Sequence, residues 1–140
     1  MKVLLAVDGS AYTKKMLAYL ATHESLLSPN NSYTLLTVQP QLPARARNVV
    51  GKEAVEAYQR EESERVLGPA SQFLLRHGIS AKSVAKVGHA GETICKVAES
   101  GQHDLVVMGS HGHGLFGNLV MGSVATQVLS HSQVPVLLVR

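Results

Sequence analysis

Short runs of apolar residues recur along the chain and alternate with longer segments in which apolar positions have helical spacing. Continuous runs this short that are rich in Val, with few polar positions among them, are typical of strands covered on both faces, as in a parallel sheet between helices. Three runs are clear and two are weaker. These five predicted strands are Val3–Val7, Leu105–Met108 and Val134–Val139, followed by Tyr33–Val38 and Ala81–Val87.

Between the strands, the apolar spacing predicts amphipathic helices. We expect Ser10 to cap the first helix and Gly78 to end the second, which is the longest. The Gly68-Pro69 pair is expected to kink or divide that helix, because Pro removes a helical hydrogen bond and clashes with the preceding turn. The predicted helices are Ala11–Leu27, Lys52–His77, Gly91–Ser100 and Ser123–Ser130.

This alternation of strands and helices predicts an α/β fold: one domain, residues 1–140, with a five-stranded parallel, Rossmann-like sheet sandwiched by helices. Ligands of such sheets bind beyond the carboxyl ends of the strands, where the strand order switches. Asp8 follows the first strand and Gly109 follows the fourth, so both border one crevice if these strands are neighbours. We expect Gln39–Gly51 to be a long exposed loop that shades the mouth of this crevice.

Composition narrows the class of protein. Hydrophobic residues make up 45% of the 140 residues and charged residues 16%, which is too apolar for a disordered chain. The net charge of +3 is mild, Lys and Arg are scattered, and there are only four Tyr, two Phe and no Trp. A nucleic-acid-binding protein normally has a basic patch and stacking aromatics, so this function is disfavoured.

The expected compartment is the cytoplasm. Cys95 is the single cysteine, so no disulfide forms within one chain, and its helical surroundings predict a buried apolar role. The apolar start of the chain reaches Asp8 before a signal-peptide core is complete, and no segment approaches the length of a membrane span. We therefore expect no membrane association.

A glycine pattern follows the fourth predicted strand. Gly109-Ser110-His111-Gly112 is followed by nine residues and then by Gly122-Ser123, where the last predicted helix begins. Glycine allows a backbone to approach a ligand closely, and a helix N-terminus presents amide groups with a partial positive charge. The amides of Ser123 and Val124 are placed to point at anionic oxygens. The pattern therefore predicts a phosphate-binding loop.

These residues resemble the universal stress protein (UspA) superfamily, in its ATP-binding branch. The Gly-x2-Gly-x9-Gly-Ser/Thr pattern of that branch is matched at the required spacing, and the resemblance covers essentially the whole chain. Two other segments fit the same family. They are Val7-Asp8-Gly9-Ser10 at the end of the first strand and Val134-Pro135-Val136-Leu137-Leu138-Val139 at the last strand.

The resemblance implies an adenine nucleotide alpha hydrolase-like fold that binds ATP. It places adenine between the ends of the first and second strands, and the residues between Gly112 and Gly122 as a flap over ribose and phosphates. At the position after Gly112 the family often has Arg or Lys, whereas this chain has His113. The implied nucleotide-binding residues are Asp8, Val38, Met108, Gly109, Gly112, His113, Gly122, Ser123 and Val124.

Several side chains have a second interpretation. Asp8 contacts the nucleotide, organises the first helical turn, or does both. His111 and His113, with His103 or His89, superficially suggest a metal site, but no third ligand has convincing spacing, so no metal held by protein alone is expected. A Mg²⁺ ion carried by the nucleotide phosphates is favoured, with Asp8 as the nearest partner. The remaining histidines are expected at helix ends: His23, His77 and His131.

Binding is favoured over catalysis, because the sequence lacks a Gly-x4-Gly-Lys-Ser/Thr loop, a kinase signature and a nucleophile elbow. The leading hypothesis is a nucleotide-responsive stress protein read by an unknown protein partner. The alternatives are a slow ATPase or enzyme acting on an adenylated metabolite, and a structural dimer with no ligand. The uncharged strand Val134–Val139 predicts a homodimer through a sheet edge, unless the chain's own helix covers that edge.

Overall fold

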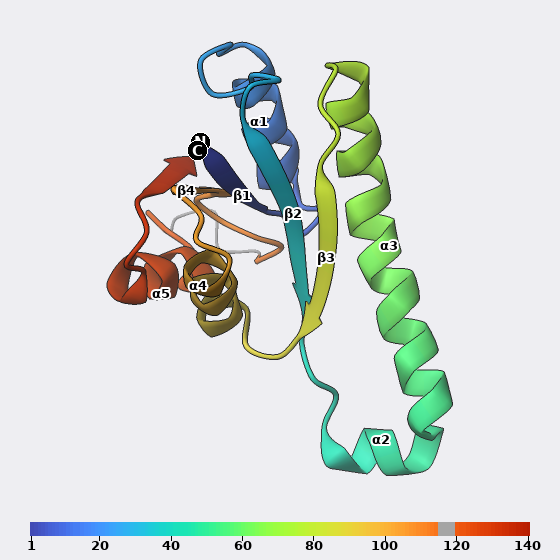
Figure 1. Cartoon of the computed structure of the whole chain (residues 1–140). Helices are drawn as coiled ribbons and strands as arrows, with labels where there is room; N and C mark the ends of the chain where they lie inside the picture. The colour runs from blue at the N-terminus through green and yellow to red at the C-terminus, as the bar shows by residue number, and fades with distance from the viewer. Residues whose placement is uncertain (115–119) are drawn as a thin grey trace.

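A parallel sheet forms the centre of the molecule (Figure 1). The structure is a computed structural model that describes residues 1–114 and 120–140. In this part of the chain five strands pair in the order β3-β2-β1-β4-β5, and every pairing is parallel, which confirms the predicted fold class. The strands are β1 (Lys2–Ala6), β2 (Ser32–Gln39), β3 (Lys82–Val87), β4 (Leu105–Gly109) and β5 (Val136–Val139).

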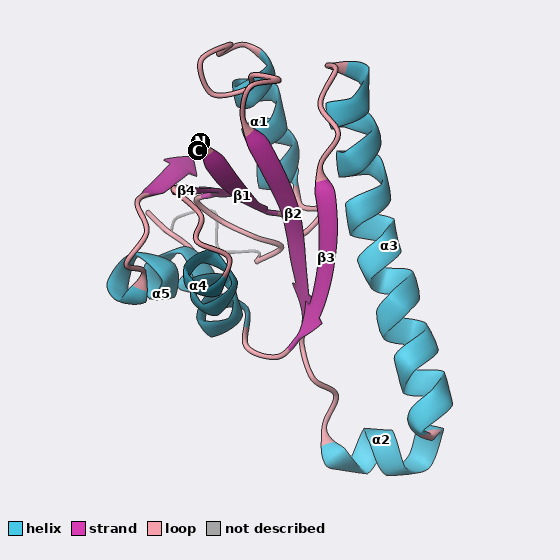
Figure 2. Cartoon of the chain, in the orientation of Figure 1, coloured by secondary structure: helices cyan, strands magenta, loops and turns pink. Residues whose placement is uncertain are grey.

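Helices cover both faces of this sheet. Figures 1 and 2 show α1 (Ala11–Ala21) and α3 (Lys52–Arg76) on one side, with α4 (Ala90–Ser100) and α5 (Ser123–His131) on the other. Side chains of the central strand β1 alternate between two cores, as the pleat requires. Val3 and Leu5 pack with the α1 and α3 side, whereas Leu4 packs with the α4 and α5 side. Burial on both faces explains why β1 has a continuous apolar sequence.

The prediction of a loop over Gln39–Gly51 was wrong, because part of this segment forms helix α2 (Ala44–Val50). The helix has good helix formers in Ala44 to Arg47 and begins directly after Pro43, which is its N-cap. None of its residues is buried, so it carries no apolar stripe that a periodicity argument can detect. It projects with the first turns of α3 beyond the sheet (Figure 1).

Pro69 does not divide the longest helix, so of the two predicted outcomes, a kink or a division, division is wrong. Helix α3 continues through it from Lys52 to Arg76. Leu67, Ala70 and Leu74 on the turns around Pro69 are buried against the sheet. A single missing hydrogen bond is offset there by packing, which supplies most of the stability of helices in proteins. Gly78 follows the helix with a φ of 77°, so the predicted glycine stop is confirmed.

The first helix is shorter than predicted, since it ends at Ala21 rather than Leu27. The hydroxyl of the buried Tyr33 holds the segment that follows: it donates to the Leu26 carbonyl at 2.6 Å and accepts from the Ser28 amide at 2.8 Å. Leu26 and Leu27 therefore pack on the core from turns rather than from a helix. Apolar spacing alone does not separate these two arrangements.

Three histidines terminate helices, as predicted. In each, ring Nδ1 hydrogen-bonds the carbonyl oxygen four residues earlier, which satisfies a carbonyl at the helix end. The pairs are His23 with Tyr19, His77 with Phe73, and His131 with Gln127. None of the helices within the described ranges has the length and apolar content needed to cross a bilayer.

A fourth histidine, His103, is buried beside β2 and is only 8% exposed. Its Nε2 lies 3.2 Å from Thr34 Oγ1, and its Nδ1 lies 3.4 Å from the Ala98 carbonyl oxygen. Burial lowers the pKa of this imidazole and outweighs the hydrogen bond to the Ala98 carbonyl, which raises it, while the Lys2 ammonium adds a smaller lowering effect. His103 is therefore neutral in the folded protein at neutral pH.

Acidification is expected to weaken folding through His103. Below its ordinary pKa of 6.5 the imidazole of the unfolded chain takes up a proton while the buried ring stays neutral, so the free energy of unfolding falls as pH decreases. Urea denaturation of the native chain and of His103→Gln over a pH series measures this. The difference in unfolding free energy between the two is expected to shrink at acid pH, and a difference independent of pH contradicts the assignment.

Candidate functional site

A cavity of about 480 Å³ opens where the carboxyl ends of the central strands meet. Strand β1 pairs with β2 on one side and β4 on the other, so the condition under which Asp8 and Gly109 border one crevice is met. The chain crosses to opposite faces of the sheet on leaving these strands, which makes this the topological switch point where α/β folds bind ligands. The volume lies within the usual range of small-molecule sites.

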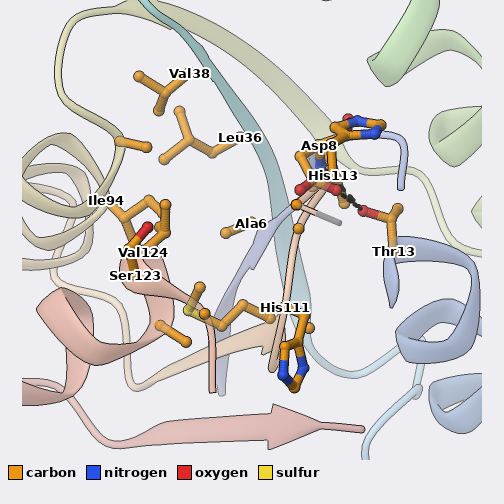
Figure 3. A pocket seen from close by; sticks show the side chains of 18 residues that line it. Ala6, Asp8, Thr13, Leu36, Val38, Ile94, His111, His113, Ser123 and Val124 are labelled. Carbon is orange, nitrogen blue, oxygen red and sulfur yellow. Dashed lines mark hydrogen bonds between the residues drawn. The ribbon is translucent and has the colours of Figure 1, made fainter. Parts of the chain in front are cut away.

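All nine residues predicted to bind nucleotide line this cavity (Figure 3), although they come from four separate parts of the chain. Sequence reasoning assigned them by motif, and the fold brings them together. The walls hold Asp8, Val38, Met108, Gly109, Gly112, His113, Gly122, Ser123 and Val124. Of the nine-residue segment expected to form a flap, residues 115–119 lie outside the described residues, so the flap stays a prediction.

Asp8 forms one polar corner of the cavity through the turn that joins β1 to α1. Its Oδ1 accepts hydrogen bonds from the Ser10 amide and the Thr13 hydroxyl, each at 2.9 Å, and its own amide donates to Thr13 Oγ1 at 3.0 Å (Figure 3). Gly9 makes the turn with a φ of 76°, which favours glycine. The turn-organising role of Asp8 is thus present, while the cavity remains beside its carboxylate.

Ser10 stands at the predicted N-cap position, but its side chain does not cap the helix. Its hydroxyl is buried and has no hydrogen-bond partner among the residues that the structure describes. Asp8 instead organises this turn by accepting from the Ser10 amide. The expectation of a side-chain cap from Ser10 was therefore wrong.

The glycines of the motif exclude a side chain for different structural reasons. A Cβ on Gly112 would lie 2.7 Å from Asp8 Oδ2, so any side chain there would displace the carboxylate. A Cβ on Gly122 would lie 3.2 Å from the Cα of His111 and 3.3 Å from the Ser110 carbonyl oxygen, against the main chain of the same loop. At Gly109 the nearest atom is Tyr12 Cβ at 2.7 Å, so this glycine is needed for packing against α1.

The N-terminus of α5 forms a second polar wall. Gly122 is its N-cap, and the Gly122 amide donates to the Ser110 carbonyl at 2.8 Å, which closes the loop onto the end of β4. Ser123 and Val124 are the first residues of the helix, as predicted, and both line the cavity. The first amides of a helix have no acceptor within it and carry the positive end of its dipole. This wall is suited to an anionic group.

Another part of the cavity wall is apolar. It is formed by Leu36 and Val38 of β2 and Ile94 of α4, and Figure 3 shows these side chains on the side away from Asp8 and His113. Sequence reasoning missed Ile94 and its neighbour Ala90, because no motif marks the first turns of α4. The available signal was indirect: α4 follows β3 and so begins at the same edge of the sheet as the other strand ends.

Two histidines of the loop lie at the cavity but are held differently. His113 Nε2 is 2.6 Å from the backbone carbonyl oxygen of Asp8. His111 Nδ1 is 2.8 Å from Ser110 Oγ, and its ring packs on Tyr12 with centroids 4.7 Å apart. Within the ranges 1–114 and 120–140, no group of three or more His, Cys, Asp or Glu side chains is arranged to hold a metal ion.

Cys95 lies one residue from Ile94 and is buried, as predicted. Its Sγ is 4.0 Å from the Val128 carbonyl oxygen, in the core between α4 and α5. Burial raises the pKa of this thiol, and the nearby Glu99 carboxylate raises it further. A protonated buried thiol is a poor nucleophile, so Cys95 contributes packing rather than covalent chemistry.

Comparison with known proteins agrees with this architecture. Universal stress protein Slr1230 of Synechocystis is 37% identical over 139 residues, which cover 99% of this chain and 42% of the relative. A universal stress protein of Thermus aquaticus is 28% identical over 139 residues, which cover 99% of this chain and 97% of the relative.

Among solved structures, the MJ0577 protein of Methanocaldococcus jannaschii has a TM-score of 0.80 at 28% identity, covering 99% of this chain and 94% of that one. The Archaeoglobus fulgidus universal stress protein in complex with dAMP has a TM-score of 0.69 at 20% identity, covering 100% and 98%. The Arabidopsis thaliana family member with AMP bound has a TM-score of 0.65 at 18% identity, covering 99% and 90%. These last two likenesses show the fold.

The match to the family extends from the first to the last residue of the chain, 1–140. The aligned regions span only part of some relatives: 42% of Slr1230, and 64% of a second Synechocystis protein, Sll1654. Strand order, helix layers and the glycine pattern at the switch point all agree with this match. The chain therefore belongs to the universal stress protein family.

Proposed function

We propose that residues 1–140 act as one universal stress protein domain that binds an adenine nucleotide, ATP, in the switch-point cavity and responds to it as a stress or regulatory protein. The observation that carries this proposal is the convergence of the nine motif residues on one cavity with an apolar end and an amide-rich end. A nucleotide has the same division, with a flat base at one end and phosphates at the other.

The apolar end suits adenine. Leu36, Val38 and Ile94 offer apolar surface for the base. Solved family members carry AMP and dAMP, which supports an adenine ligand for this chain as well. Asp8, just after the carboxyl end of β1, is placed to accept from a ribose hydroxyl or to hold a Mg²⁺ ion carried with the phosphates.

The amide-rich end suits phosphate. The Gly112 backbone and the first amides of α5 at Ser123 and Val124 are main-chain donors held by the fold, and the Ser123 hydroxyl adds a side-chain donor. This end is the reason for proposing a triphosphate rather than a nucleoside.

Binding without efficient turnover is the role that this cavity supports. Phosphoryl transfer needs cations to neutralise charge that develops in the transition state. Among the described residues that line the cavity, none is Lys or Arg. Main-chain amides stabilise the bound phosphates, but the described lining residues offer no Lys or Arg side chain to stabilise the charge that develops during hydrolysis.

Calorimetric titration of the purified chain with ATP is expected to give saturable one-site binding, and phosphate release at saturating ATP is expected to stay close to the rate without protein. Repeating both measurements with Mg²⁺ and with a chelator tests whether ATP binds together with Mg²⁺. Rapid release of phosphate identifies an ATPase, and release from an adenylated metabolite identifies the related enzyme. The absence of a binding signal at millimolar ATP leaves only the structural dimer.

Self-association through β5 is the second part of the proposal. Strand β5 is an edge of the sheet and contains only Val and Leu, whereas the other edge, β3, carries Lys82 and Lys86. Charged residues on an edge strand prevent pairing with another copy, and their absence from β5 favours it. We propose a homodimer in which the β5 edges of two chains meet, a state that sedimentation equilibrium measures directly.

A further inference from the structure

We infer that His113 is a positioning residue, which holds the start of the glycine loop against the end of β1 instead of contacting phosphate. This inference rests on the proposed function, because the loop that it positions is the proposed nucleotide-binding loop. It assigns a role to the one motif position at which the chain has His where the family often has a long cation.

The hydrogen bond of His113 defines this role. Its Nε2 lies 2.6 Å from the Asp8 carbonyl oxygen, and the two residues are 105 positions apart in sequence. A carbonyl oxygen only accepts, so the imidazole donates through a proton on Nε2. Both the neutral tautomer with that proton and the protonated ring make this bond. The contact therefore joins two strand ends, those of β1 and β4, across the mouth of the cavity.

Asp8 is a firm anchor for this contact. Its amide and its Oδ1 are both hydrogen-bonded to Thr13 in the first turn of α1. Gly112, next to His113, lies so close that an added Cβ would be 2.7 Å from Asp8 Oδ2. The loop thus meets Asp8 at two adjacent residues. If the His113 bond is lost, Gly112 loses the tie that keeps it beside the cavity.

The energetic consequence separates positioning from phosphate contact. A loop that is already held in place loses less conformational freedom when a ligand binds, so every ligand that uses the loop binds more tightly by the same factor. A cation that contacts phosphate instead contributes more as the phosphate charge increases. The effect of His113 on AMP, ADP and ATP, which all carry phosphate to the loop, should therefore be equal if it positions the loop.

The test compares three substitutions by calorimetric titration of the full chain with AMP, ADP and ATP. His113→Gln keeps an amide donor close to the position of imidazole Nε2, whereas His113→Asn has the same amide on a shorter side chain, and His113→Ala has no donor. We expect His113→Ala and His113→Asn to lower the affinity for all three ligands by a common factor of about five- to tenfold. The Gln variant is expected to stay within about twofold of the native chain.

His77→Ala provides a matched control, because it also removes a histidine bonded to a backbone carbonyl but lies at the end of α3, outside the cavity. It should leave all three affinities unchanged. Circular dichroism checks that each variant is folded, which is expected because His113 is exposed. A loss that grows from AMP to ATP, no loss in Ala, or a Gln variant that behaves like Ala overturns the inference.

Amide hydrogen exchange in the protein without ligand gives a second readout. If His113 holds the loop, the amides of Gly112 and Gly114 exchange faster in His113→Ala than in the native chain, and Gln restores the slow rate. Equal rates in all variants overturn the inference even if ATP binds. Conversely, if no nucleotide binds the native chain, the proposed function fails while exchange still tests the positioning role.

Discussion

Replacing Gly122 with Val is expected to abolish ATP binding while the chain remains folded. The Gly122 backbone has a φ of −74° and ψ of 164°, an ordinary region for any residue, so the substitution does not strain the backbone itself. The added Cβ instead presses on main-chain atoms of the loop, 3.2 Å from His111 Cα and 3.3 Å from the Ser110 oxygen. The two γ-carbons of Val extend this crowding at the N-terminus of α5.

The expected loss of affinity is about 100-fold or more, or roughly 3 kcal/mol of binding free energy, because the loop and the α5 amides move apart. The cost in unfolding free energy is expected to be about 1–3 kcal/mol, typical of overpacking. Calorimetry measures the first quantity and urea denaturation the second. The Gly122 amide donates a hydrogen bond to the Ser110 carbonyl oxygen, and the displacement of this bond is the local change that lowers both ATP affinity and stability.

Gly68→Val is the matched control for this experiment. It is the same substitution in α3, outside the cavity, and beyond the adjoining backbone of its own helix the described atom that its added Cβ approaches is Glu64 Oε1 at 3.3 Å, the end of a flexible side chain. ATP affinity should be unchanged in this variant. If Gly122→Val is folded and binds ATP as tightly as the native chain, the assignment of the phosphate site to this loop is incorrect.

Substitutions of Asp8 are expected to separate its two roles. In Asp8→Ala, the Ser10 amide and the Thr13 hydroxyl lose their shared acceptor, and the free energy of unfolding should fall by about 1–3 kcal/mol. Asp8→Asn keeps an oxygen at the Oδ1 position, so its loss of stability should be less than about 1 kcal/mol. Urea denaturation of the two variants measures this difference.

Both Asp8 variants are expected to bind ATP more weakly, by about tenfold or more, because each removes the charged carboxylate. This group is proposed to accept a hydrogen bond from a ribose hydroxyl or to hold Mg²⁺. Titration with and without Mg²⁺ distinguishes these two contacts: a loss that appears only with Mg²⁺ indicates the metal. If Asp8→Asn binds ATP more tightly than the native chain, the carboxylate faces phosphate directly and repels it, which contradicts the proposed orientation.

Local patterns in the sequence predicted most of the fold. The Val-rich runs around Leu4 and Val107 identify strands buried on both faces, since only such strands need apolar side chains at every position. The order of elements then leaves few topologies, because crossovers between parallel strands are right-handed. Elements without an apolar stripe escaped this reasoning. Helix α2 is the clearest example, because none of its residues is buried.

The site was predicted in part. The glycine motif identified Gly112, Gly122 and Ser123 because close backbone approach requires glycine and a helix start requires free amides. Ile94 was missed, since its place at the cavity depends on how α4 packs against β2 rather than on any local pattern. Whether these residues bind nucleotide stays a prediction until the titrations are made.

The sequence by itself determined the strands, the parallel α/β class and the position of the glycine loop, because each depends on residues close together in the chain. Only the tertiary structure decided that Pro69 is accommodated, that Ser10 does not cap its helix, and that His113 reaches Asp8. These outcomes depend on contacts between residues far apart in sequence or on burial. Packing energy then exceeds the local preferences that a sequence pattern reports.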